Sequence, residues 1–154
     1  MVNKRVSLET IPVSLLEGMM QIEHYLKNCG MDRKLLELVK YRVSQINGCG
    51  YCLDMHHKEA VLLGESEQRL HGLAAWRDSP YYSPEEREVL AYAEVLTLTQ
   101  VHNVEDRLFE SLRAHFSLEE IVILTLAITQ INSWNRISKA FGSVPGSYEA
   151  KAPK

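Results

Sequence analysis

Apolar residues recur along most of this chain at the three- and four-residue spacing that gathers side chains on one face of an α-helix. After Asp32, for instance, one such face is formed by Leu35, Leu36, Leu38, Val39, Val43 and Ile46. We find no segment in which apolar and polar residues alternate as they do in a half-buried β-strand. The pattern therefore predicts an all-α, single-domain bundle of about six or seven helices over residues 1–154.

Start and stop signals divide this pattern into separate helices. Ser83 and Ser117 are each followed three residues later by a glutamate, which is the signature of a capping box, and Asn103 is a further candidate N-cap. We expect helices over residues 12–30, 32–46, 50–63, 66–76, 83–99, 103–115 and 117–142. The core would then span residues 10–142, and residues 143–154 would form a flexible tail.

The longest apolar run, residues 121–128, lies in the last predicted helix and makes it apolar on more than one face. A helix of that kind is either central in its domain or buried in an oligomer interface. The run is much shorter than the roughly 20 residues needed to cross a membrane. Residues 1–7 carry positive charge but lead into no continuous apolar segment, so we expect no signal peptide and a cytoplasmic protein.

Composition narrows the classes of function. The net charge is −3, and no basic stripe follows a predicted helix, which argues against nucleic acid or an anionic membrane as the partner. The three cysteines are a poor framework for disulfides, whereas a close pair in a reducing compartment is more often redox-active or metal-binding. That pair is Cys49 and Cys52, and we interpret Cys29 as an inert core residue.

The segment around this pair has the spacing of a dithiol site. Asn47-Gly48 is a turn signal, so we expect Cys49 at the start of a helix and Cys52 one turn inside it. Unpaired backbone N–H groups and the helix dipole stabilise a thiolate there, which by itself makes Cys49 the more acidic thiol. His56 lies four residues beyond Cys52 on the same face, where it could accept a thiol proton.

Two other interpretations of the cysteine pair are weaker. With the following histidine it offers three ligands to zinc, but a structural zinc site needs four, and no second pair or nearby histidine completes the set. We therefore expect no metal. A thioredoxin-type motif belongs after a β-strand, and the sequence pattern predicts none.

Glu37 is followed by eleven residues and then by Cys49, Cys52 and His56. In these four positions the chain resembles the alkylhydroperoxidase D-like (AhpD-like) branch of the carboxymuconolactone decarboxylase family, which carries Glu, eleven residues and then Cys-x-x-Cys-x-x-x-His. Further stretches similar to that branch bring the resemblance to most of residues 10–142: 42–60, 73–80, 83–94 and 132–136.

The resemblance implies a thiol-dependent peroxidase that reduces alkyl hydroperoxides or hydrogen peroxide. In that family the second cysteine is the peroxidatic thiol, here Cys52, so that Cys49 would be the resolving thiol, and His56 and Glu37 would form the proton relay. No bound cofactor is implied, and an external dithiol, either a protein or a small molecule, would reduce the disulfide. The family also implies a homo-oligomer, a trimer or a hexamer, with the active site near subunit contacts.

Four further residues are candidates for a supporting role. Tyr51 stands where the best-studied branch has a histidine, and with an ordinary pKa of about 10 a tyrosine is a weaker proton carrier at neutral pH. Asn132, Trp134 and Asn135 either support the pocket or pack the last helix.

Two other functions stay open. A dithiol–disulfide exchanger or redox sensor would form the disulfide without repeated peroxide turnover. The lactone decarboxylation for which the wider family is named does not depend on a cysteine pair, so the presence of the pair makes this lyase activity the weaker alternative.

Overall fold

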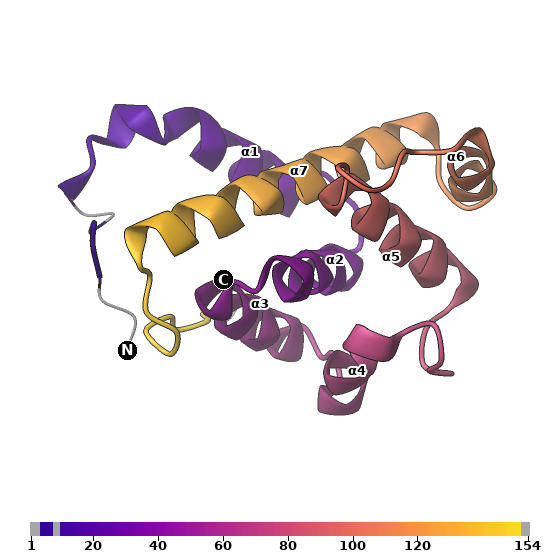
Figure 1. Ribbon diagram of the computed structural model, residues 1–154, viewed down its shortest axis with the longest axis horizontal. Coiled ribbons are helices and arrows are strands. Elements are labelled where there is room, and N and C mark those ends of the chain that lie inside the picture. The colour runs from indigo at the N-terminus through magenta and orange to yellow at the C-terminus, as the bar shows by residue number, and fades with distance from the viewer. Residues whose placement is uncertain (1–3, 8–9, 152–154) are drawn as a thin grey trace.

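The computed structural model describes residues 4–7 and 10–151 and confirms the all-α fold (Figure 1). Within these residues there are two short 3-10 turns, η2 (Val13–Leu15) and η3 (Leu73–Ala75). The α-helices in the same residues are α1 (Glu17–Asn28), α2 (Arg33–Asn47), α3 (Gly50–Leu62), α4 (Glu67–Gly72), α5 (Pro84–Thr97), α6 (Asp106–Arg113) and α7 (Leu118–Phe141).

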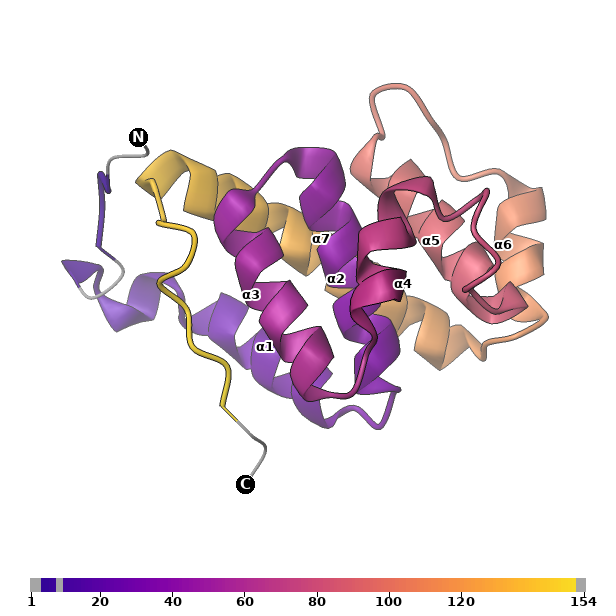
Figure 2. The ribbon, with the colours of Figure 1, turned by 90° about the horizontal axis from the view of Figure 1, so that it is seen from below.

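Helix α2 is the centre of the bundle, since it packs against α3, α5 and α7 (Figures 1 and 2). The long helix α7 crosses these elements and also contacts α1 and α6. Its buried face is aliphatic, and it faces the main core, whereas Leu118 and Val122 on another face are 52% and 65% exposed. Of the two positions expected for this helix, the structure therefore shows the central one for its buried face.

A tight turn joins α2 to α3 and fixes where the cysteines lie. The carboxylate of Asp32 caps the start of α2 by accepting a hydrogen bond from the backbone N–H of Lys34 at 2.9 Å. At the other end Gly48 adopts a left-handed conformation, with φ at 59°, that an L side chain would strain. The chain then reverses, and Cys49 becomes the N-cap of α3, as the turn signal predicts.

A smaller second core is formed by residues of α2, α3, α4 and α5, and a partly buried carboxylate on α5 lies beside it. Trp76 in this core donates its indole N–H to Glu94 of α5 at 2.8 Å. Arg42 of α2 donates to the same carboxylate oxygen at 2.6 Å, and Arg77 donates to the other oxygen. One carboxylate therefore joins α5 to α2 and to the segment that holds Trp76 and Arg77.

Some helix boundaries differ from those predicted. The first helix begins with the separate turn η2, and the fourth ends as an α-helix at Gly72 before continuing as η3. The expected cap at Asn103 is wrong, because α6 begins at Asp106 and its N-cap is Glu105, two residues after Asn103; Glu105 makes no side-chain capping bond. The start of α6 thus follows its packing on α5 rather than a local capping signal. Both capping boxes, at Ser83 and Ser117, are present.

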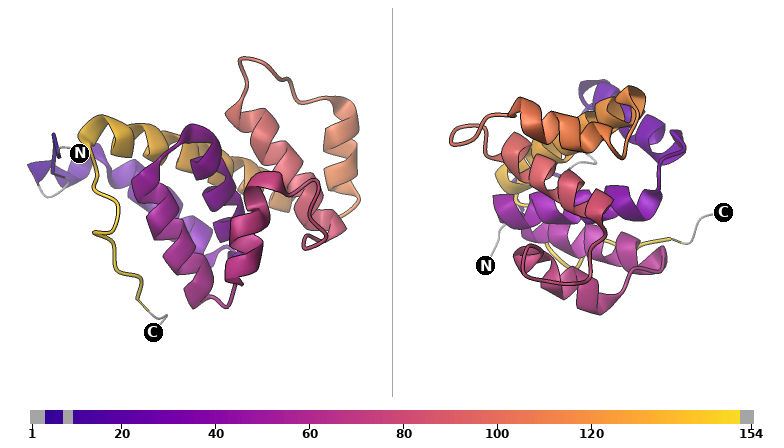
Figure 3. Two further views of the ribbon diagram at one scale, coloured as in Figure 1. Left: turned by 60° about the horizontal axis from the view of Figure 1, so that its bottom comes forward. Right: turned by 90° about the vertical axis from the view of Figure 1, so that its right-hand side faces the viewer.

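Residues 143–151, which we expected to belong to a flexible tail, lie along α3 in this structure (Figures 2 and 3). The backbone N–H of Gly146 donates to Asp54 at 3.1 Å, and Lys58 donates to the carbonyl oxygen of Tyr148 at 2.8 Å. Pro145 lies so close to Gly50 that a Cβ there would meet its ring at 3.1 Å. The rest of the expected tail, residues 152–154, lies outside the described residues.

In the described ranges, no single helix is both long and apolar enough to cross a membrane. The pair α6 and α7 meets that criterion only when the two are joined across a bend of 119°.

Candidate active site

Cys49 and Cys52 are joined in a disulfide at the start of α3, with their Cα atoms 5.4 Å apart. Both residues are 1% exposed. Cys29 is a free, partly buried thiol at the end of α1, where its sulfur donates to the carbonyl oxygen of Leu26 at 3.3 Å. The structure thus brings together the two cysteines that the sequence singled out and leaves the third unpaired.

His56 and Glu37 form a buried pair across the α2–α3 turn. The ring nitrogen Nδ1 of His56 lies 2.7 Å from Oε2 of Glu37. Because an ionised carboxylate can only accept, we assign the proton of a neutral imidazole to Nδ1, which leaves Nε2 as a free base. Nε2 is buried and has no hydrogen-bond partner among the described residues. An unpartnered buried nitrogen of this kind is costly unless a reacting group uses it.

Electrostatics keep Glu37 ionised. Burial by itself would raise the pKa of this carboxyl, but the charge and hydrogen bond of His56 and those of Lys40 outweigh burial and lower the pKa from 4.5 to about 2. For Lys40, burial would lower the pKa, and the charges of Glu37 and Glu23 raise it above its ordinary value instead. At neutral pH the site therefore holds a fixed carboxylate and a fixed ammonium.

A cavity of about 320 Å3 lies beside this pair and reaches one of the two cysteines. Cys52 and His56 line it, while Cys49 does not belong to its lining in the described part of the chain. Much of the wall is apolar and comes from α1, α2, α3 and α7: Met20, Leu26, Leu36, Met55 and Ile137. A small organic molecule in this space would therefore contact Cys52 and not Cys49.

The structure separates the four supporting candidates into two groups. Tyr51 and Trp134 line the cavity. Asn132 and Asn135 are not among its lining residues, and both accept a hydrogen bond from the side chain of Asn47 at 2.9 Å. They therefore tie α7 to the end of α2, next to the turn that places the cysteines.

Sequence spacing did not indicate several polar residues of the cavity wall, among them Glu23, Lys40, Glu59 and Tyr148. Lys40 and Glu23 are ion-paired with Nζ–Oε2 at 3.3 Å. A lysine one turn after Leu36, on the apolar face of α2, was a signal that could have found them. The other two, Glu59 and Tyr148, are joined by a hydrogen bond that Tyr148 donates. Tyr148 comes from the tail, and no spacing rule connects a tail residue with α3.

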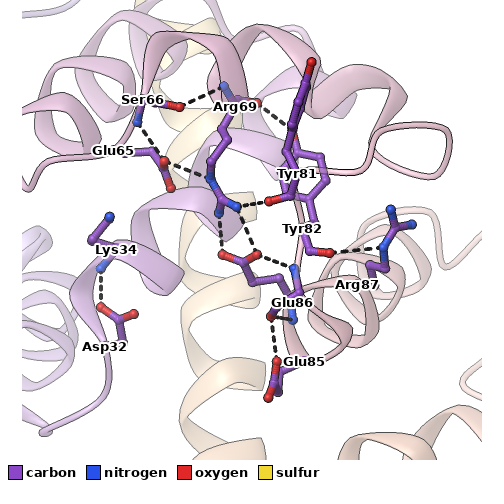
Figure 4. A network of polar contacts seen from close by, with 11 residues as sticks. Asp32, Lys34, Glu65, Ser66, Arg69, Tyr81, Tyr82, Glu85, Glu86 and Arg87 are labelled. Carbon is purple, nitrogen blue, oxygen red and sulfur yellow. Dashed lines mark hydrogen bonds and ion pairs between the residues drawn. The ribbon is translucent and has the colours of Figure 1, made fainter.

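A second, more open hollow lies between the α3–α4 turn and the start of α5, and a network of charges crosses it (Figure 4). Arg69 donates to Glu65 at 2.9 Å and also to Glu86, and its carbonyl oxygen accepts from Tyr82 at 2.5 Å. These groups satisfy one another, so the network acts as a clamp between α4 and α5. In the part of the chain that the structure describes, no group of three or more His, Cys, Asp and Glu side chains could hold a metal ion.

Comparison with known proteins places the chain among related sequences. The model of the carboxymuconolactone decarboxylase family matches residues 14–95. The uncharacterized protein YdfG of Bacillus subtilis is 45% identical over 141 residues, which cover 92% of this chain and 96% of YdfG.

Two solved structures share the fold. A protein of unknown function from Agrobacterium tumefaciens, named as a candidate antioxidant defence protein AhpD, is 38% identical with a TM-score of 0.90, and the match covers 95% of this chain and all of that one. The debrominase Bmp8 is 18% identical with a TM-score of 0.78, over 87% of this chain and 72% of Bmp8. Since a debrominase shares the fold, the fold alone does not determine the reaction.

Proposed function

Since the chain belongs to the carboxymuconolactone decarboxylase family, in its AhpD-like branch, we propose that it is a thiol-dependent peroxidase acting through Cys49 and Cys52. The observation that carries this proposal is that Cys52 and His56 line the same cavity, while Nε2 of His56 is a buried nitrogen with no hydrogen-bond partner among the described residues. Helix electrostatics alone would make Cys49 the more acidic thiol. The cavity favours Cys52 as the attacking thiol, because Cys52 belongs to its lining and Cys49 does not.

In the first step the thiol of Cys52 gives its proton to Nε2 of His56, and the thiolate attacks the terminal oxygen of the hydroperoxide. An S–O bond forms, the O–O bond breaks, and the leaving alkoxide takes the proton back from His56 to depart as an alcohol. Glu37 accepts the hydrogen bond from Nδ1 throughout, which holds the ring in the orientation and tautomer that the step needs.

In the second step Cys49 attacks the sulfur of the resulting Cys52 sulfenic acid. The S–S bond forms, and the hydroxyl group leaves as water with the proton of the Cys49 thiol. The Cα atoms of the pair, 5.4 Å apart, lie within the range that a disulfide spans. An external dithiol then supplies two electrons and two protons by thiol–disulfide exchange and restores both thiols. The organic hydroperoxide or hydrogen peroxide and this dithiol are therefore the proposed partners, and no bound cofactor takes part.

The test is peroxide consumption by the reduced protein with excess dithiothreitol. We expect many turnovers for the parent protein and for the matched control Cys29→Ser, and none above background for Cys52→Ser. In the absence of dithiothreitol, pre-reduced Cys49→Ser should consume one equivalent of peroxide and stop at the sulfenic acid, because the resolving thiol is missing. Equal turnover by the parent and Cys52→Ser would overturn the proposal.

The same assay identifies the alternatives. A parent protein that forms the Cys49–Cys52 disulfide but consumes no more than one equivalent of peroxide is an exchanger or sensor. A lactone decarboxylation that survives blocking of the thiols would assign the lyase activity instead.

We also propose that the chain assembles as a trimer or hexamer. In support, large apolar side chains on η2, α1 and α7 are exposed in the single chain: Val13, Leu15, Met20, Leu118 and Val122. Sedimentation equilibrium tests this proposal, and a monomer at micromolar concentration would refute it.

A further inference from the structure

We propose that Lys40 is a positioning residue of this site: held between Glu23 and Glu37, its charge keeps Glu37 ionised and thereby keeps Nε2 of His56 free to take the proton of Cys52. The inference rests on the proposed role of His56 as the base for Cys52. Its test needs no peroxide turnover.

Five buried or partly buried side chains form a continuous chain of polar contacts across four helices. The indole N–H of Trp134 on α7 donates to Oε1 of Glu23 on α1 at 2.9 Å. The other oxygen of Glu23 lies 3.3 Å from Nζ of Lys40 on α2, and the same Nζ lies 3.5 Å from Oε1 of Glu37. Glu37 in turn reaches His56 on α3 through its second oxygen. The side chain of Lys40 is only 5% exposed, so this ammonium has little access to water and depends on its two carboxylates.

A fixed cation is needed because the charge of His56 changes during the proposed reaction. While His56 carries the proton of Cys52, it helps to keep Glu37 ionised; once the proton has left, that help is reduced to a neutral hydrogen bond. Burial then favours a protonated Glu37, which would donate to Nδ1 and move the imidazole proton to Nε2. In that tautomer His56 cannot accept a proton from Cys52. Lys40 does not titrate in the reaction and so holds Glu37 ionised in both states.

Other charged groups lie near the Lys40–Glu37 ion pair, and none of them can replace Lys40 as the partner of Glu37. Lys27 on α1 and Arg33 on α2 line the cavity, but neither lies within ion-pairing distance of Glu37. The other titratable residues of the cavity lining carry no positive charge: α3 contributes Tyr51, Cys52 and Glu59, and the tail contributes Tyr148. Helix α7 contributes only side chains that do not titrate, namely Trp134, Ile137 and Ser138. On the α5 side of α2, the carboxylate of Glu94 is already paired with Arg42.

The experiment measures the reactivity of Cys52 in a background where it is the sole cysteine, Cys29→Ser with Cys49→Ser. The rate of alkylation by iodoacetamide is followed from pH 5 to 9, a range chosen to include the ordinary pKa of a thiol at about 8.5. Lys40→Met is paired with Glu23→Gln, so that no buried carboxylate is left without its partner. Lys40→Arg keeps the charge, and Lys34→Met removes a cation from the same helix outside the cavity lining.

The alkylation rate rises with pH as the Cys52 thiol ionises, and we call this rise the acid limb of the profile. In the Glu23→Gln, Lys40→Met protein we expect the midpoint of this rise to move upward by about 1–3 pH units, the shift that loss of a nearby opposite charge produces. Lys40→Arg should restore the limb, and Lys34→Met should leave it in place. A doubly substituted protein that is folded by circular dichroism and has the parent profile would overturn the inference, as would an equal shift from Lys34→Met. If the parent protein shows no peroxide turnover but the doubly substituted protein shows the shifted alkylation profile, only the proposed peroxidase reaction is overturned.

Discussion

The carboxylate of Glu94 is bound by two arginines in different surroundings, and this difference predicts unequal costs for removing them. Arg42 donates from Nε at 3.1 Å and from Nη2 at 2.6 Å, and its side chain is 14% exposed. Arg77 donates once, at 2.5 Å, and its side chain is 58% exposed. We predict that Arg42→Met destabilises the fold much more than Arg77→Met does.

The magnitudes follow from burial. A hydrogen bond to a charged group is worth about 1.5–3 kcal/mol where water is largely excluded, so losing the two bonds of Arg42 should cost about 3 kcal/mol. An exposed ion pair is worth about 0–1 kcal/mol, and the stacking of Arg77 on Trp76 at 4.2 Å adds a similar amount, so Arg77→Met should cost about 1 kcal/mol.

Urea unfolding followed by circular dichroism measures both free energies. In thermal unfolding, a chain of this length loses about 2–4 °C of Tm per kcal/mol, so Arg42→Met should lower Tm by about 6–12 °C and Arg77→Met by about 2–4 °C. Combining Arg42→Met with Glu94→Gln should cost less than the sum of the two, because they remove one shared interaction. Equal costs for the two arginine variants would refute the argument from burial.

Three further predictions concern the core, the turn and acid stability. Ile128→Ala on α7, where the side chain is fully buried, should cost about 2–5 kcal/mol in urea unfolding. Gly48→Ala should cost about 1–2 kcal/mol, because φ at 59° strains an L residue, and a Tm equal to that of the parent would contradict this. The Glu37 pKa is lowered from 4.5 to about 2, so its stabilisation is present above pH 4.5 and is lost as pH falls toward 2. Between pH 5 and 3.5 the unfolding free energy of the parent should therefore fall about 1 kcal/mol more than that of the Glu37→Gln, His56→Gln variant.

The helices and the dithiol pair could be predicted because each depends on residues close together in the sequence. The capping boxes at Ser83 and Ser117, the turn at Gly48 and the spacing from Cys49 to His56 all act within one or two turns of helix. Local spacing failed at Asn103, where packing of α6 on α5 decides the first residue of the helix.

The surroundings of the dithiol pair depend on contacts between residues far apart in the chain, and the spacing of residues along the sequence does not reveal these contacts. Glu23 meets Lys40 across 17 positions, and Tyr148 meets Glu59 across 89. Which cysteine faces the cavity is likewise a matter of how α1, α2, α3 and α7 close around it. A resemblance in the cysteine motif therefore indicates the type of chemistry, while the shape and charge of the cavity emerge only in the folded chain.

The path of the tail over α3 bears on how such a protein can diversify. Tyr148 and Ser143 form part of the cavity wall, yet they lie outside the helical bundle and are attached to it by few contacts. Replacing or shortening this segment would change the size of the cavity without replacing a cysteine or a relay residue. The C-terminal end is therefore a place where new substrate preferences can arise at little cost to folding, while Gly50 sets the limit, since a larger residue there would push the segment away from the site.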